Sequence, residues 1–192
     1  MRALMLIGLL WLSGCAGLPP QERAEWEQHR AQLAALTDWT ASGKLAVRSG
    51  EQSATANLNW LQLGRHSHLE LSGPLGFQAT RIHSDGEQLH VTRGDEQTRF
   101  DLSRPGALRA YTGWDLPVQS LSWWLRGLPA PHSRAGTDIE GGLLRTLRQD
   151  GWTIHYSNYQ HTGAFALPGR LELERGDTGA RLIIRRWQAG SA

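Results

Sequence analysis

A switch to a hydrophobic period of two constrains this chain more than any other feature of its sequence. From Trp39 to Val47 every second residue is apolar or small, and after a Ser-Gly turn the run from Ala54 to Trp60 alternates in the same way. Alternation of this kind is typical of strands that bury one face. The two runs therefore predict a half-buried antiparallel hairpin.

Shorter strands are predicted along the rest of the chain, separated by turns that contain Asp-Gly or Gly-Asp pairs, because glycine accepts the positive φ of tight hairpins. Helices are predicted at 22–36, where Trp26, Leu33 and Leu36 share a stripe, at 103–111, and from Pro117 until Gly127 ends it. Residues 129–142 predict a loop. The later strands are expected around residues 69–71 and over 77–83, 89–92, 100–102, 143–149, 152–156, 171–175 and 180–187. The pattern is that of an antiparallel meander interrupted by short helices.

Charge and length exclude some classes of protein. The 20 Lys and Arg residues nearly balance the 18 Asp and Glu residues, so the sequence carries no basic footprint for nucleic acid. Cys15 is the only cysteine, which leaves no intramolecular disulfide. The length is enough for one domain with a sizeable core, which we expect over residues 21–192.

The N-terminus has the layout of an export signal. Residues 1–14 carry one charge, Arg2, and then an apolar run too short to span a bilayer. Leu12-Ser13-Gly14-Cys15 resembles the lipobox of bacterial lipoproteins, in which the cysteine thiol receives a diacylglyceryl group. We therefore expect a removed signal peptide (1–14), a lipid-modified Cys15 and a short tether (15–20). The alternative is an ordinary secretory signal with a chance cysteine.

The sequence has none of the common catalytic motifs for hydrolases or nucleotide-binding enzymes. His66 and His68 fall on one face of a predicted strand, and His83 and His90 could join them around a metal ion. A solvated polar strand face explains the same residues, and no carboxylate or cysteine recurs at ligand spacing. We therefore predict no metal, no cofactor and no catalytic residue.

Eight of the nine tryptophans lie beyond residue 14, on predicted strands and helices. They can form a packed core. A curved sheet closed by helices can instead leave an apolar cavity for a hydrophobic ligand. The sequence leaves both possibilities open.

The segment from Ser72 to Phe77 predicts a turn with an apolar centre. Gly73, Pro74 and Gly76 favour the turn, and Leu75 lies in the middle of it. A single exposed leucine is ordinary. On a protein tethered to a bilayer, such a leucine is also well placed to enter lipid.

Several segments in order resemble the LolB family of outer-membrane lipoprotein receptors. They are Trp39 with Ser42-Gly43-Lys44-Leu45, Trp60, Gly73-Pro74-Leu75-Gly76, Leu116-Pro117-Val118 with Leu121, Trp124-Leu125-Arg126-Gly127-Leu128-Pro129, Gln149-Asp150-Gly151-Trp152-x-Ile154-x-Tyr156, Leu167-Pro168 and Leu182-x-Ile184-x-x-Trp187. The resemblance implies a mainly β fold, an open antiparallel half-barrel with a helical lid over an apolar cavity. It also implies attachment to the periplasmic face of the outer membrane, which Ala16, in place of an aspartate after the cysteine, favours.

The same resemblance implies a function without catalysis. The cavity would accept acylated lipoproteins from LolA, a soluble periplasmic carrier, and deliver them to outer-membrane lipid, with Leu75 as the membrane-inserting residue. We expect a monomer. A membrane-tethered scaffold without a lipid cavity is the alternative, and a lipid hydrolase a more distant one. The residues expected to line the cavity are Leu45, Val47, Leu58, Trp60, Leu69, Leu71, Leu121, Trp124, Leu125, Ile154 and Tyr156.

Overall fold

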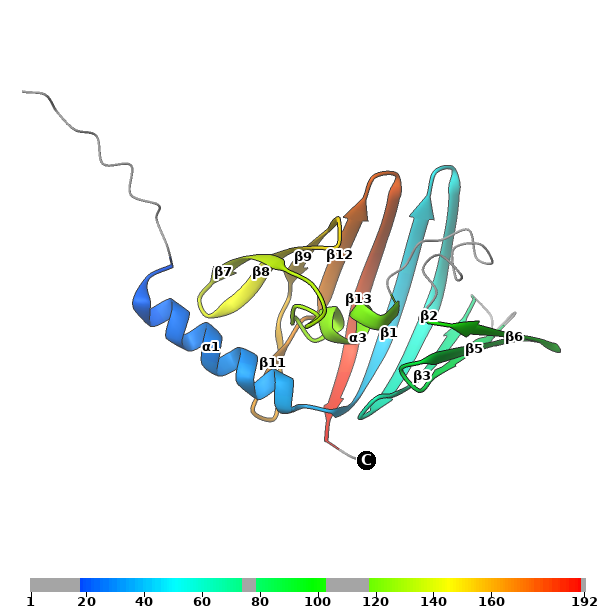
Figure 1. The fold of residues 1–192 in the computed structure, drawn as a ribbon, viewed down its shortest axis with the longest axis horizontal. Coiled ribbons are helices and arrows are strands. Elements are labelled where there is room, and N and C mark those ends of the chain that lie inside the picture. Colours follow the sequence, from blue (N-terminus) through cyan, green and yellow to red (C-terminus); the bar gives the residue numbers. More distant parts are fainter. Residues whose placement is uncertain (1–17, 74–78, 103–117, 191–192) are drawn as a thin grey trace, which may run out of the picture.

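A single large antiparallel sheet forms the body of the computed structural model, which describes residues 18–73, 79–102 and 118–190 (Figure 1). Its 11 strands follow the order β6-β5-β4-β3-β2-β1-β13-β12-β9-β8-β7. The strands are β1 (Asp38–Ser49), β2 (Gln52–Leu63), β3 (His66–Ser72), β4 (Thr80–Ser84), β5 (Gln88–Arg93), β6 (Glu96–Asp101), β7 (Ala135–Glu140), β8 (Leu143–Gln149), β9 (Trp152–Ser157), β12 (Arg170–Arg175) and β13 (Thr178–Ala189). Within the described residues the edge strands β6 and β7 do not pair with each other, so the sheet is open.

The central strands β1, β2 and β13 are the longest, and their register follows the alternation in the sequence. Ala41 lies opposite Trp60 on one side and Trp187 on the other. A bulge follows Ser42, where the pairing with β13 shifts. A Cβ at Gly43 would overlap the carbonyl oxygen of Ile183, so the close approach of the two strands requires glycine. The bulge and this contact bend the centre of the sheet.

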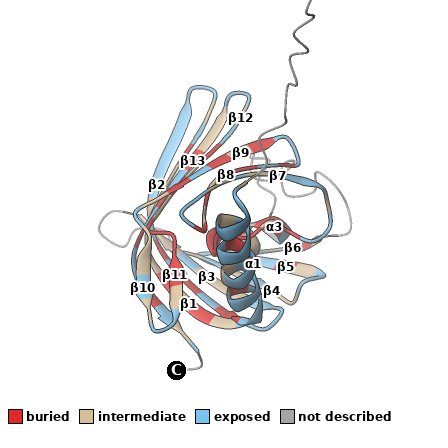
Figure 2. Ribbon diagram, turned by 90° about the vertical axis from the view of Figure 1, so that its left-hand side faces the viewer, coloured by how far each residue is buried: buried red, intermediate tan, exposed pale blue. Residues whose placement is uncertain are grey.

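Two helices, α1 (Pro20–Ala35) and α3 (Val118–Leu125), lie inside the curve of the sheet (Figure 2). The predicted stripe of α1 is confirmed, because Trp26 and Leu33 are buried, as is Leu36 just beyond its end. From α3, Trp124 and Leu125 are buried against the sheet. None of the helices in the described parts of the chain is long and apolar enough to cross a membrane.

The main apolar core lies between the helices and the inner face of the sheet. The indole ring of Trp39 packs 5.4 Å from the rings of both Trp60 and Trp187, measured between centroids. A second, smaller cluster lies on β5 and β6, where Leu89, Val91 and Phe100 are buried. Of the tryptophans for which the sequence left a packed core and a lined cavity open, six are buried in the main cluster, namely Trp26, Trp39, Trp60, Trp124, Trp152 and Trp187.

The predicted loop at 129–142 is wrong over its second half, because β7 forms there and pairs with β8. Strand β7 lies at the edge of the sheet, and only Thr137 and Ile139 of its residues are partly buried. Its sequence therefore lacks the strong alternation of apolar and polar residues that predicts a strand. The short hairpin of β10 (Gln160–Thr162) and β11 (Phe165–Leu167) was also not predicted. The predicted helix at 103–111 lies outside the described residues, and so does the start of the strand predicted at 77–83.

Candidate functional site

The inner face of the sheet gathers all eleven residues that the sequence analysis assigned to a cavity. Each belongs to the main apolar cluster or packs against it. Seven are buried, namely Val47, Leu58, Trp60, Trp124, Leu125, Ile154 and Tyr156. The other four, Leu45, Leu69, Leu71 and Leu121, are partly exposed. The predicted set is therefore one continuous apolar surface that combines covered and accessible side chains.

On the sheet, the accessible residues of this surface lie on one half, beside Val47, Leu58 and Trp60, which are buried. On the half formed by β8, β9 and β12, Leu144, Leu147 and Ile154 are fully buried. Helix α1 packs against β7 and β8 on that half and against β11. On the half formed by β1 and β3, Leu45 and Leu69 keep part of their surface accessible. An apolar ligand can therefore contact the inner face from the β1–β3 half.

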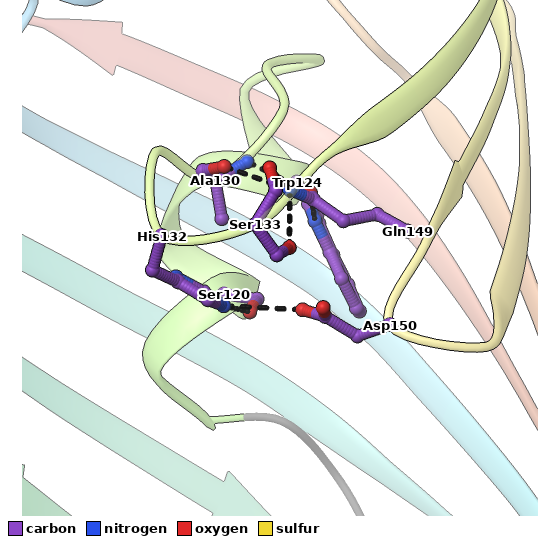
Figure 3. Close-up of polar contacts among 7 residues, drawn as sticks. All are labelled: Ser120, Trp124, Ala130, His132, Ser133, Gln149 and Asp150. Carbon is purple, nitrogen blue, oxygen red and sulfur yellow. Dashed lines mark hydrogen bonds and ion pairs between the residues drawn. The ribbon is translucent and has the colours of Figure 1, made fainter.

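Gln149 fixes α3 and the segment after it to β8 (Figure 3). Its Oε1 accepts hydrogen bonds from Trp124 Nε1 at 2.8 Å and from the Ala130 backbone N–H at 2.9 Å. Its Nε2 donates to the Ala130 carbonyl oxygen at 2.7 Å and to Ser133 Oγ at 3.0 Å. Both ends of this buried amide are therefore satisfied, which holds the Trp124 indole in one orientation.

Arg126 joins the two helices. Its Nη1 donates to the carbonyl oxygens of Leu33 at 3.0 Å and Leu36 at 2.6 Å, and its Nε donates to Ser122 at 3.1 Å. Carbonyls at a helix C-terminus lack intrahelical partners and attract cations. Burial lowers the pKa of Arg126 to about 10, which still leaves it charged at neutral pH. The guanidinium therefore caps α1 while it sits at the end of α3.

Ser120, His132 and Asp150 come together beside α3, as Figure 3 shows, but not as a catalytic relay. Ser120 Oγ lies 3.2 Å from His132 Nε2, and Asp150 Oδ2 lies 3.1 Å from the same nitrogen. A hydrolytic triad uses both ring nitrogens, one for the serine and one for the carboxylate. Ser120 is also buried. The contact therefore links α3 to the turn between β8 and β9.

The four histidines considered as metal ligands, His66, His68, His83 and His90, lie on strands β3, β4 and β5, and their side chains are on the face opposite to Leu69 and Ile82. His68, His83 and His90 are opposite one another on β3, β4 and β5, and the Nδ1 atoms of His68 and His83 are 2.7 Å apart. An open hollow of about 340 Å³ beside them includes Thr40 and Leu61. In the part of the chain that the structure describes, no group of three or more potential ligands is placed to hold a metal ion.

Three aromatic polar groups on the inside have no hydrogen-bond partner among the described residues: Trp39 Nε1, Trp152 Nε1 and the Tyr156 hydroxyl. Burial raises the pKa of Tyr156 well above its ordinary value, so its hydroxyl stays protonated. Buried donors are nearly always paired in native proteins.

Sequence reasoning did not identify Arg126, Gln149 or the unpaired Tyr156 hydroxyl as special. Arg126 and Gln149 occur in the segments that resemble the family, but their partners are distant in sequence. Cys15 and Leu75, with Pro74 and Gly76, lie outside the described residues. Gly73 is described and directly follows β3.

A family model and two curated relatives match this chain under the same family name. Residues 37–187 match the family described as outer membrane lipoprotein LolB. A protein of Stutzerimonas stutzeri with the name outer-membrane lipoprotein LolB is 41% identical over an alignment of 190 residues, and the match covers 93% of this chain and 91% of that protein. A protein of the same name from Ectopseudomonas mendocina is 37% identical over an alignment of 198 residues, and the match covers 98% of this chain and 97% of the relative.

Solved structures with low sequence identity share the fold. A LolA superfamily protein from Nitrosomonas europaea aligns with a TM-score of 0.56 at 11% identity, covering 89% of this chain and 94% of its own. A DUF1329 family protein from Desulfovibrio piger aligns with a TM-score of 0.60 at 9% identity, covering 88% and 93%. The open sheet with helices inside its curve is therefore the LolA-like fold.

Proposed function

The chain belongs to the LolB family of outer membrane lipoproteins, and on that premise we propose that it receives acylated lipoproteins on its apolar inner face and inserts them into the outer membrane. The observation that carries this proposal is the continuous apolar surface between the sheet and its helices, which is covered on the β8–β12 half and partly accessible on the β1–β3 half through Leu45, Leu69 and Leu71. The expected fold, a half-barrel with a helical lid, is confirmed by the open sheet.

The energetics of transfer require only burial of hydrocarbon. Transfer of each methylene from water to an apolar site is favourable by about 0.8 kcal/mol. A chain of a dozen or more methylenes therefore strongly prefers an apolar site to water. Leu45, Leu69 and Leu71 offer such contacts at the accessible half. Because all of these contacts are apolar, they select for shape more than for chemistry, which suits a receptor for many lipoproteins.

The route of the cargo follows from this preference. A soluble carrier of the LolA type delivers the acyl chains, and they pass from one apolar surface to another and then to lipid. Direction comes from differential affinity, so the transfer needs no catalytic residue and no cofactor. The relatives are named as lipoproteins, and the Ser120, His132 and Asp150 contact lacks the geometry of a hydrolytic relay.

Anchoring completes the proposal. A lipid-modified Cys15, left after removal of residues 1–14, holds the domain of residues 21–192 at the periplasmic face of the outer membrane through a tether of residues 15–20. Stable attachment needs more than one acyl chain, which a mature bacterial lipoprotein carries. Leu75 is proposed to enter the bilayer, and the domain to act as a monomer. A scaffold without a lipid site is not favoured, because it has no use for an accessible apolar inner face.

A transfer assay tests the function. Purified chain without its anchor is mixed with carrier loaded with radiolabelled lipoprotein, and the cargo on each protein is measured after they are separated. Cargo should move to this chain. Retention of the cargo on the carrier contradicts the proposal.

Two leucines on neighbouring strands provide a matched pair of variants for this assay. Leu69→Glu places a carboxylate on the inner face, where it opposes apolar chains, and should block transfer. Leu61→Glu places the same charge on the outer face, where Leu61 is 36% exposed, and should leave transfer intact. Denaturation curves for both variants establish that they are folded. Equal transfer by the two variants would rule out the inner face as the site.

A further inference from the structure

The inward-facing side chains of β3 and β4 form a strip that lies uncovered between two covered parts of the sheet. On β2, at one side of the strip, the inward-facing Leu58 and Trp60 are buried. On β5, at the other side, Leu89 and Val91 are buried. The inward-facing residues of β3 and β4 are instead all partly exposed, namely Ser67, Leu69, Leu71, Thr80, Ile82 and Ser84. We refer to these residues as the β3–β4 strip.

The β3–β4 strip is continuous with the apolar surface of the inner face. Leu69 lies opposite the buried Trp60 on β2 and opposite Ile82 on β4, and Ile82 lies opposite the buried Val91 on β5. Leu69 and Leu71 pack against the main apolar cluster, whereas Ile82 packs against the smaller one. The strip therefore joins the two clusters through apolar side chains that remain accessible.

The chemistry of the β3–β4 strip suits hydrocarbon. Its centre is apolar, and its ends carry only hydroxyls, from Ser67 opposite Ser84 at one end and from Thr80 at the other. A charged ligand would lose water here without meeting an opposite charge, whereas hydrocarbon gains apolar contact. The outward-facing residues of the same strands are charged groups or imidazoles, namely His66, His68, Glu70, Arg81 and His83.

The dimensions of the strip match those of one acyl chain. Between Ser67 and Leu71 the strand rises about 14 Å, at about 3.4 Å per residue. One leaflet of a hydrocarbon core of ~30 Å, which a single acyl chain spans, is about 15 Å thick. The two strands of the strip lie about 4.8 Å apart, so an extended chain fits between the covered side chains of β2 and β5.

We propose that the β3–β4 strip binds one acyl chain of the cargo lengthwise, with Ile82 as a contact on β4. This inference rests on the proposed function and extends the acyl site beyond the β1–β3 half. The methyl end of the chain points toward Gly73, which follows β3 and begins the connection that contains Leu75. A chain that moves along the strip in this direction leaves the protein with its methyl end first, which is the end that enters a bilayer.

The opposite end of the strip accommodates the part of the cargo that stays in water. Beyond Ser67 and Ser84 lie the turns that contain Arg65 and Gly86, and both of these residues are exposed. The glyceryl end of the acyl chain, which carries the cargo protein, therefore lies at an exposed end of the sheet and not beneath the helices.

A spin-labelled stearic acid locates the bound chain in the unsubstituted protein. It is added to the chain without its anchor, isotopically labelled on the backbone amides and on the methyl groups of Ile and Leu, and signal broadening is measured by NMR. Signals of Leu69, Leu71 and Ile82 should broaden strongly. Ile183 is the matched control, because it is 40% exposed on the outer face and should keep its intensity. A label near the methyl end should act most on Leu71, and a label near the carboxyl end most on the Ser67 amide.

Two substitutions on β4 test the same contact by affinity. Ile82→Asp places a carboxylate in the strip, and His83→Asp adds the same charge to the outer face of the strand. Displacement of a fluorescent fatty acyl probe should show about tenfold weaker binding by Ile82→Asp, which corresponds to lost contact with about two methylenes. His83→Asp should bind as the unsubstituted chain does, and Ile82→Leu, which keeps the site apolar, should retain the affinity. Denaturation curves establish that the variants are folded.

The outcomes separate this inference from the function beneath it. Absence of fatty acyl binding by the unsubstituted chain contradicts the proposed function and the inference with it. Broadening of Leu45 and Leu121 without Ile82 overturns the inference alone, and so does equal broadening of Ile82 and Ile183 or full affinity in Ile82→Asp. A gradient of broadening in the reverse direction overturns the direction assigned to the chain. The spin-label measurement decides the matter even if a variant fails to fold.

Discussion

Replacement of Arg126 by methionine tests whether α1 and α3 are held together as one unit. The substitution removes three hydrogen bonds from a charged donor, and two of them cap the carbonyls of Leu33 and Leu36. Bonds to charged groups contribute ~1.5–3 kcal/mol each. Part of this loss is offset, because Arg126 is only 6% exposed and the variant no longer has to bury its charge. We expect a net loss of about 3 kcal/mol, or about 6–12 °C in melting temperature for a domain of this size.

Urea denaturation of the chain without its anchor measures this loss as a lower midpoint with an unchanged m-value. Arg126→Lys keeps the charge but loses the planar fork, so its loss should be smaller, about 1–2 kcal/mol. Arg30→Met is the control on α1, the helix that Arg126 caps. The ion pair of Arg30 with Glu27 is half exposed and should contribute less than about 1 kcal/mol. Equal midpoints for Arg126→Met and Arg30→Met would refute the capping role.

Hydrogen exchange shows where the loss acts. Amides in the last turns of α1 should exchange faster in Arg126→Met, whereas those of β1 and β13 should not, because the sheet does not depend on this contact. Uniform acceleration across the domain would mean that the side chain supports the whole core and not the junction of the helices.

Four further predictions concern the anchor, the loop, the bulge and one surface carboxylate. Cys15→Ala should leave the folded domain in the soluble fraction, and continued pelleting with membranes would contradict the anchor. Leu75→Glu should preserve cargo binding but impair delivery to liposomes; equal loss of both activities would count against the loop. Gly43→Ala should cost about 1–3 kcal/mol because its Cβ meets backbone, whereas Gly136→Ala, with ordinary space, should be nearly neutral by denaturation. Hydrogen bonds and charges from Arg170 and Arg181 lower the pKa of Glu172, so its stabilisation is present above the ordinary pKa of a glutamate and is lost as the pH falls through the lowered value. Glu172→Gln should therefore lower the melting temperature more at pH 7 than in acid.

The sequence was sufficient to predict the centre of the sheet. Alternation is strong where one face is buried and the other is in water, as from Trp39 to Val47 and from Ala54 to Trp60, and these segments are β1 and β2. The apolar set of the inner face was predicted together with the resemblance to the LolB family, and its members on strands occupy inward positions, which share one surface.

Other features depend on contacts that no local pattern encodes. Most residues of β7 are exposed, so its sequence does not need to alternate between apolar and polar residues. Arg126 lies 93 residues from Leu33, and its burial becomes understandable only when the end of α1 is placed beside it. The hydroxyl of Tyr156 has no partner because of the side chains around it in the fold. The alternation in the sequence indicates only that Tyr156 faces inward.

The unpaired edges of the sheet also determine how much the interior can hold. In a closed barrel the number and stagger of the strands set the internal volume. Here β6 and β7 do not meet within the described residues, and α1 and α3 form the opposite wall. The space between the two walls is therefore not set by the stagger of a closed ladder of strands. It is set by the side chains that join the helices to the sheet, with Gln149 tying α3 to β8 and Arg126 making α1 and α3 a single piece.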